Sequence, residues 1–178
     1  TVASGYVYRR SSTQIRYRDL FVVRGASYLP SLLNHHVGQA WLTYAMARAY
    51  GIDLRRMAGA TLLVYASWAG CMLLLACVAL WAAKLAVGWV LLALAAGVVY
   101  LGVIAARPAR LRSYSVLAPL FEAGVSGHLL AMAMRLPHLA VLFVGTWLPF
   151  WFFGVEVPLA AALMYVPILM VVVTLPIT

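Results

Sequence analysis

The stretch RGASYLPSLLNHHVGQAWLTYAMAR, residues 24–48, decides how the rest of the chain is interpreted. It is apolar enough to enter a bilayer, and an arginine stands at each of its ends. Its middle nevertheless concentrates residues that a lipid-facing helix avoids: Pro30, Asn34, His35, His36, Gly38 and Gln39. Each unpaired polar group in hydrocarbon costs several kcal/mol, so this stretch must be covered by protein or line a polar cavity.

The composition of the whole chain predicts an integral membrane protein. Of its 178 residues, 66% are hydrophobic and 10% are charged, whereas soluble domains are about 45–50% apolar and about 25% charged. The basic residues that give the chain its net charge of +9 lie between the apolar runs. That placement is typical of basic loops that face the cytoplasm, so we expect no nucleic-acid partner.

The apolar runs predict an all-α, polytopic membrane protein with re-entrant and interfacial helices. We expect a single membrane domain over residues 1–178, cut at both ends from a longer protein. Spanning helices are expected at residues 57–82, 85–106, 136–153 and 157–175. Residues 115–134 have one broad apolar face, which favours a helix in the interface, although Gly124 and Gly127 argue against a straight one.

The distribution of arginine predicts the orientation of these helices. Residues 48–56 and 107–135 are basic, whereas the turn at Lys84 and the turn at 154–156 are poor in cations. The basic segments are therefore expected in the cytoplasm. Residues 9–24 are also arginine-rich, so residues 24–48 are expected to enter from the cytoplasm, break, and return as a re-entrant hairpin. The alternative is a poorly hydrophobic helix buried in the bundle.

Two segments resemble the lysylphosphatidylglycerol synthase transmembrane (flippase-like) family. One is RGASYLPSLLNHHVGQAW, followed by a basic loop and a long apolar helix. The other is RLPHLAVLFVGTWLPFWFFGVEVPLAAALMYVPILMVVVTLPIT, with its Arg-Leu-Pro, its Phe-Gly before a proline-led helix, and its Leu-Pro-Ile. The resemblance covers most of residues 19–178, and Asn34, Gly38 and Gln39 occupy the positions of the family's Asn and Gly-Glu or Gly-Gln.

This resemblance implies a polytopic protein of the bacterial inner (plasma) membrane that handles or translocates lipids. The expected cargo is an anionic or polyprenyl-phosphate-type lipid, and membrane lipids are the expected partners, with homo-oligomers or other membrane subunits also open. The chain lacks the family's soluble aminoacyl-transfer domain, so lipid synthesis is not implied. Two alternatives stay open: a non-transporting structural or partner-binding membrane subunit, and a membrane-embedded lipid-modifying enzyme.

The candidate ligand-binding residues are Arg24, Asn34, His35, Gly38, Gln39 and Arg48. A broken helix exposes N–H groups that attract anions, and an arginine guanidinium can hold a phosphate through two hydrogen bonds. His35 and His36 are neighbours, about 100° apart on a helix, so no metal site is expected from them. We expect no cofactor and no enzymatic activity, because the four acidic residues are scattered and no nucleophile or phosphate-loop motif occurs. Arg135 is expected to extend to the lipid headgroups.

Overall fold

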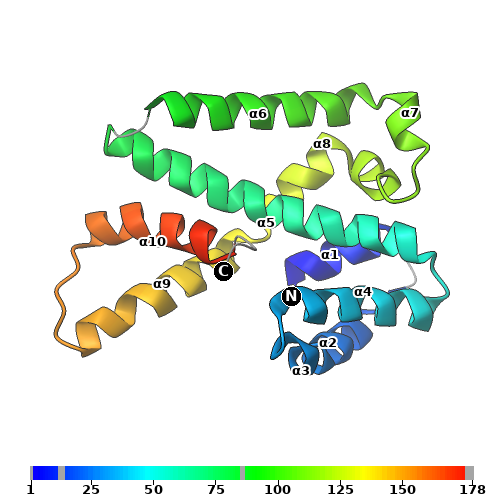
Figure 1. Cartoon of the computed structure of the whole chain (residues 1–178), viewed down its shortest axis with the longest axis horizontal. Helices are drawn as coiled ribbons and strands as arrows, with labels where there is room; N and C mark the ends of the chain where they lie inside the picture. Colours follow the sequence, from blue (N-terminus) through cyan, green and yellow to red (C-terminus); the bar gives the residue numbers. More distant parts are fainter. Residues whose placement is uncertain (1, 12–14, 85–86, 175–178) are drawn as a thin grey trace. The chain divides into compact units, whose positions relative to one another are not determined.

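The computed structural model describes residues 2–11, 15–84 and 87–174, and all regular structure in these ranges is helical (Figure 1). This confirms the all-α prediction. The helices are α1 Val2–Ser11, α2 Tyr17–Ala26, α3 Tyr28–Ser31, α4 His35–Tyr50, α5 Leu54–Ala82, α6 Val87–Ala106, α7 Ala109–Arg112, α8 Ala118–Ala133, α9 Leu136–Phe152 and α10 Leu159–Thr174. The Leu-Pro-Ile motif and the first two residues of the expected span 85–106 lie outside the described residues.

Three helical runs of the described chain are long and apolar enough to cross a membrane: Leu54–Trp81, Val87–Ala106 and Ala118–Phe152. They identify the chain as a membrane-embedded protein. The third run joins α8 to α9 across a turn at residues 134–135. The apolar part of α10, Leu159–Met170, is shorter, so a fourth crossing by this helix stays a prediction.

The chain packs into two compact units. The first comprises Thr1–Ala66 and Val103–Ala131, and the second comprises Ser67–Gly102 and Met132–Thr178. Helices α5 and α6 each contribute one part to each unit. The division into two units does not decide whether the chain is one domain, because these two helices run through both units. The expectation of one membrane domain over residues 1–178 stays a prediction.

The core of the first unit brings α1, α2, α4, α5 and α8 together. Its most deeply buried large side chains share exposures below 2% and include Tyr8, Leu20, Leu42, Met46, Met57 and Leu63. Helix α4 ends at Gly51, whose φ of 62° is the left-handed conformation that glycine adopts at helix ends. The chain then turns through Asp53, which accepts from the Arg55 N–H at 3.3 Å, and α5 packs against α4.

Helix α8 is broken at Gly124, where φ is 62° and ψ is 179°. This combination is accessible almost only to glycine. The halves before and after the break run in different directions (Figure 1). The prediction that residues 115–134 do not form a straight helix is therefore confirmed, whereas their place in the membrane interface stays a prediction.

The second unit has its own apolar cluster around Cys71, Met72 and Leu139. Arg135 lies beside this cluster, only 6% exposed, and its Nε donates to Ser67 Oγ at 2.8 Å. The expectation that Arg135 extends to lipid headgroups is wrong, because α5 supplies a hydroxyl partner within the unit. A buried guanidinium needs such partners, since an unpaired one would be very costly.

Candidate functional site

Residues 24–48 form most of a helical hairpin. Helices α2 and α3 lead to a turn at residues 32–34, and α4 returns along both of them. Gly38 lies at the closest approach of the two arms: a Cβ placed there would lie 2.7 Å from the Ser27 carbonyl oxygen and would overlap the Ser31 hydroxyl. Ser31 itself donates to the Ser27 carbonyl at 2.7 Å. Gly38 is thus required by packing, whatever else it does.

Asn34 starts α4. Its backbone is extended, and its Oδ1 accepts a hydrogen bond from the His36 N–H at 2.7 Å. Asparagine is among the best residues at this position, because its oxygen satisfies one of the N–H groups left unpaired at a helix start. The Oδ1 atom therefore has a capping role, and only the Nδ2 amide could donate to a ligand.

Arg24 and Gln39 form the polar centre of the hairpin. Arg24 Nη1 donates to Gln39 Oε1 at 2.6 Å, so the two arms are joined by a direct hydrogen bond. On its other side, Gln39 Nε2 donates to the Tyr8 hydroxyl at 3.3 Å. Gln39 is only 6% exposed. A buried amide needs both of its ends paired, and here each end has a partner.

The Gln39 end of this pair is hydrogen-bonded to a buried network of hydroxyl groups. Tyr8 Oη lies 2.9 Å from Thr61 Oγ1, which lies 2.8 Å from Thr43 Oγ1. Thr43 also donates to the Gln39 carbonyl one turn earlier in α4, at 2.9 Å. Burial raises the pKa of the Tyr8 phenol, so it stays neutral and can act as both donor and acceptor. The network therefore fixes Gln39, and through it Arg24, without adding a charge.

None of the acidic residues of the first unit neutralises Arg24. Asp19 accepts from the Tyr50 hydroxyl, Asp53 accepts from the start of α5, and Glu122 pairs with Arg56 at 2.5 Å. Glu156, the last of the four acids, belongs to the second unit. The Arg24 guanidinium instead meets the neutral Gln39 amide and the ring of Tyr28, whose centre lies 5.8 Å away. It keeps a positive charge in a partly buried position.

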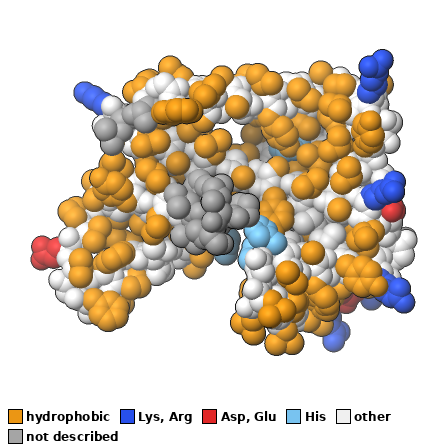
Figure 2. Space-filling model, in the orientation of Figure 1, with side chains coloured by type: hydrophobic (Ala, Val, Ile, Leu, Met, Phe, Trp, Pro, Cys, Tyr) orange, Lys and Arg blue, Asp and Glu red, His pale blue; other side chains and the backbone are white. Residues whose placement is uncertain are grey.

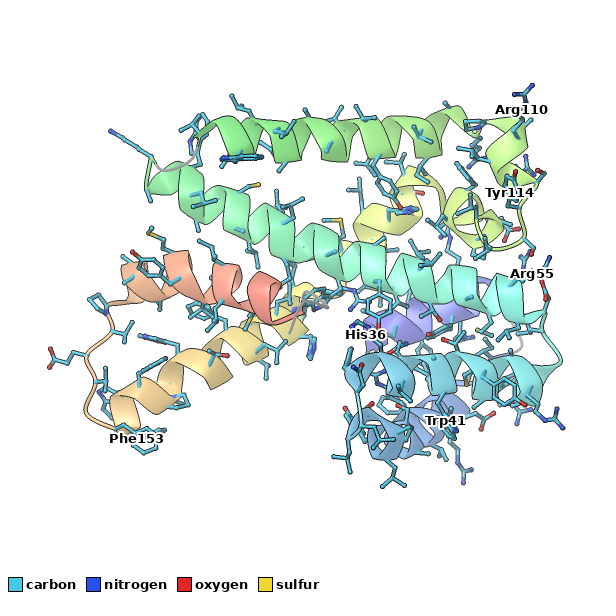
Figure 3. All side chains as sticks on the ribbon, in the orientation of Figure 1. His36, Trp41, Arg55, Arg110, Tyr114 and Phe153 are labelled. Carbon is cyan, nitrogen blue, oxygen red and sulfur yellow. The ribbon has the colours of Figure 1, made fainter. Side chains whose placement is uncertain are left out.

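The histidines occupy the first turn of α4. The ring centres of His35 and His36 are 5.8 Å apart, and His36 lies 6.4 Å from the ring of Tyr65 in α5. Figure 3 shows His36 at this end of α4, next to α5. Partial desolvation, then the charges of Arg24 and His36, lower the pKa of His35. His35 is therefore neutral at pH 7 unless an anion binds beside it.

Arg48 lies apart from the other predicted site residues. It is exposed near the end of α4, about 13 Å beyond Gln39 at a rise of about 1.5 Å per residue. The structure thus gathers Arg24, Asn34, His35, Gly38 and Gln39 in the turn-side half of the hairpin and leaves Arg48 at the other end.

The outside of the hairpin is strongly apolar. Leu29, Leu32 and Leu33 surround the turn with exposures of 73%, 84% and 85%. Figure 2 shows hydrophobic side chains over this part of the molecule with histidine beside them, and Lys and Arg lie along the edges of the same face. In the first unit, Arg55 and Arg110 lie at the end opposite His36 (Figure 3). The hairpin is therefore strongly apolar around Leu29, Leu32 and Leu33, whereas the start of α4 beside them exposes the polar residues Asn34, His35 and His36.

No family model, curated protein or solved structure matches this chain. The resemblance to the lysylphosphatidylglycerol synthase transmembrane family accordingly stays a prediction that rests on the quoted motifs. Within the described ranges, no group of three or more His, Cys, Asp or Glu is placed to hold a metal ion.

Sequence reasoning did not identify Tyr8, Thr43 and Thr61 as part of this site. Thr43 could have been found, because it follows Gln39 by one helical turn and shares its face. Tyr8 and Thr61 come from α1 and α5, and only the packing of separate helices brings their hydroxyl groups to Gln39.

Proposed function

We propose that this chain binds and translocates lipids with an anionic or polyprenyl-phosphate-type headgroup, and that Arg24 is the charged contact for that headgroup. The observation that carries the proposal is the state of Arg24: its guanidinium is fixed by Gln39 at 2.6 Å, yet no acid of the first unit neutralises it. A fixed, uncompensated guanidinium in a partly buried position is suited to bind a phosphate.

The proposal includes re-entrant insertion of the hairpin α2–α4. Burying the side chains of Leu29, Leu32 and Leu33 in hydrocarbon favours insertion by roughly 1.5–3 kcal/mol for each fully buried side chain. The polar groups of the inner surface stay covered, because Gln39, Thr43 and Tyr8 bond to one another. Non-helical backbone at membrane depth must be covered by protein or line a polar cavity, so the exposed turn at residues 32–34 requires a polar cavity or lipid headgroups around it. The arginines at the far end would then stay with the headgroups of the cytoplasmic leaflet.

The first turn of α4 offers further donors for the same headgroup. The Nδ2 amide of Asn34 can donate, and His35 can donate from either ring nitrogen once protonated. A lipid that reaches Arg24 along the apolar outside of the hairpin would keep its acyl chains in hydrocarbon while its phosphate meets the polar centre. The family resemblance independently supports such a function and a place in the bacterial plasma membrane.

Reconstitution in liposomes tests this proposal. The measurement is scrambling of a fluorescent phosphatidylglycerol, followed by chemical quenching of the outer leaflet. We expect Arg24→Gln to reduce the initial rate about tenfold, because a hydrogen bond to a charged group contributes about 1.5–3 kcal/mol, and we expect Arg24→Lys to retain part of it. Arg48→Gln removes the same charge from the other end of α4 and should retain most of the rate.

Three other outcomes would contradict the proposal. Equal rates for the wild type and Arg24→Gln would remove Arg24 from the site. Absence of scrambling by the wild type in vesicles that bind it stably would favour the structural or partner-binding subunit. A lipid of altered mass after incubation would identify an enzyme instead.

A further inference from the structure

The break in α8 brings two arginines to a single peptide unit. Arg10 Nη2 donates to the Ala123 carbonyl at 3.2 Å. Arg107 lies against the next residue: its Nη2 is 3.2 Å from the position that a Cβ of Gly124 would take. The two guanidinium groups therefore flank the Ala123–Gly124 peptide, although they come from α1 and from the end of α6.

Arg10 is held in place by its neighbours, and Arg107 has an unusual backbone conformation. Arg10 Nη1 donates to the Tyr6 hydroxyl at 2.8 Å, and the Arg10 guanidinium passes so close to Gly127 that a Cβ there would lie 3.3 Å from its Nε. Arg107 adopts a φ of 47°, which an arginine rarely takes, directly after α6. Both side chains remain exposed, so an anion from the solvent or the membrane interface can reach them.

The charge of this pair is not balanced within the first unit. Glu122 is the nearest acid along the chain, but it pairs with Arg56 at 2.5 Å. Arg10 has a structural role at the break, because it donates to the Ala123 carbonyl directly before Gly124. The second arginine has no such structural account. Two like charges beside neighbouring residues repel each other, and a bound anion relieves that repulsion.

We propose that the break in α8 is a binding site for a phosphate group, held between Arg10 and Arg107. Two guanidinium groups match the geometry of phosphate oxygens. The second half of α8 starts at the same place, and its first N–H groups add a partial positive charge. This site is separate from the one at Arg24 and does not depend on it. Its phosphate comes either from a lipid headgroup or from a soluble ion.

Binding to the full chain in detergent distinguishes these two sources. Native mass spectrometry measures retention of phosphatidylglycerol against a diacylglycerol of the same acyl chains, which lacks the phosphate. Thermal unfolding measures stabilisation by inorganic phosphate against chloride at equal ionic strength. The variants are Arg10→Gln with Arg107→Gln, and Arg107→Gln alone, which leaves Arg10 on the Ala123 carbonyl. The matched control, Arg110→Gln with Arg112→Gln, removes two charges from the neighbouring helix α7.

We expect the double variant at the break to weaken phosphate-dependent binding about tenfold or more, the single variant to weaken it less, and the control to resemble the wild type. Loss confined to phosphatidylglycerol assigns the site to a lipid headgroup, and loss confined to inorganic phosphate assigns it to a soluble ion. In the native mass spectra, Arg24→Gln should remove one bound phosphatidylglycerol and the double variant at the break should remove another, and the three substitutions together should remove both, which separates the break from the proposed translocation site. Equal binding by the control and both variants at the break would overturn the proposal.

Discussion

Gly38 shows how a single residue sets the distance between the two arms of the hairpin. Its missing side chain leaves room for the Ser27 carbonyl and the Ser31 hydroxyl, which a Cβ would meet at less than van der Waals separation. We expect Gly38→Ala to lower the free energy of unfolding by about 1–3 kcal/mol, because the arms must separate. The measurement is thermal or denaturant unfolding in detergent.

Gly25 provides the matched control for Gly38. It also lies in a helix of the hairpin, but a Cβ there would meet nothing within 4 Å. Gly25→Ala should therefore leave stability unchanged or raise it by up to about 1 kcal/mol, because alanine favours a helix more than glycine does. Equal stability of the two variants would show that the arms do not pack at Gly38 as described.

The lowered pKa of His35 leads us to expect that headgroup binding depends on pH. Desolvation and the Arg24 and His36 charges lower its pKa below the ordinary value of 6.5, so the free protein binds few protons at this ring near neutral pH. A phosphate beside the ring favours the protonated form and raises the pKa. Binding then takes up a proton, and affinity should increase as the pH falls below about 6.5.

Phosphatidylglycerol is a suitable probe for that dependence, because its phosphodiester keeps one negative charge across the range in which histidine titrates. Affinity should rise several-fold between about pH 7.5 and about pH 5.5 in the wild type and stay flat in His35→Gln. His36→Gln removes the neighbouring ring and should retain the rise. A flat profile in the wild type would show that His35 does not contact the bound headgroup.

At the scale of elements, the sequence predicts what local chemistry controls. Long apolar runs predicted the helices that can cross a membrane. Gly124 predicted that α8 is not straight, and α8 breaks there because glycine readily takes a φ of 62°. The arginines of residues 9–24 predicted that residues 24–48 turn back instead of crossing, and the structure does turn at residues 32–34, whereas re-entrant insertion of this hairpin stays a prediction. These features depend on residues close together in the chain.

Contacts between elements could not be read in the same way. Arg135 was expected at the headgroups but donates to Ser67, which lies on another helix. Arg10 and Arg107 meet at Gly124 only because α1 and the end of α6 both reach α8. One sequence carries no direct signal for such pairs, since their spacing in the chain follows no helical period. The composition of residues 24–48 pointed to the candidate site in the hairpin, whereas nothing in the sequence pointed to its hydroxyl network.

For the molecule as a whole, the third apolar run is longer than the hydrocarbon core of a membrane is thick. Ala118–Phe152 contains 35 residues, which would extend about 52 Å as one straight helix, against a hydrocarbon core of about 30 Å. The break at Gly124 and the turn at 134–135 divide this run, so we expect α9 alone to cross, in agreement with the predicted span 136–153. Residues before the turn are then expected at the cytoplasmic interface, as part of the predicted basic segment 107–135 and together with residues 48–56.

This arrangement predicts the labelling pattern of single cysteines in sealed vesicles, with the buried thiols Cys71 and Cys77 replaced by alanine. Membrane-impermeant maleimide should label Arg110→Cys from the cytoplasmic face, and Lys84→Cys and Glu156→Cys from the opposite face.

Cysteines at both ends of the hairpin, Arg18→Cys and Ala49→Cys, should label from the cytoplasmic face. Leu33→Cys, at the turn, should resist labelling from both faces until detergent is added. Labelling of positions 18 and 49 from opposite faces would make residues 24–48 a true span, and free labelling of Leu33→Cys would place the hairpin outside the hydrocarbon.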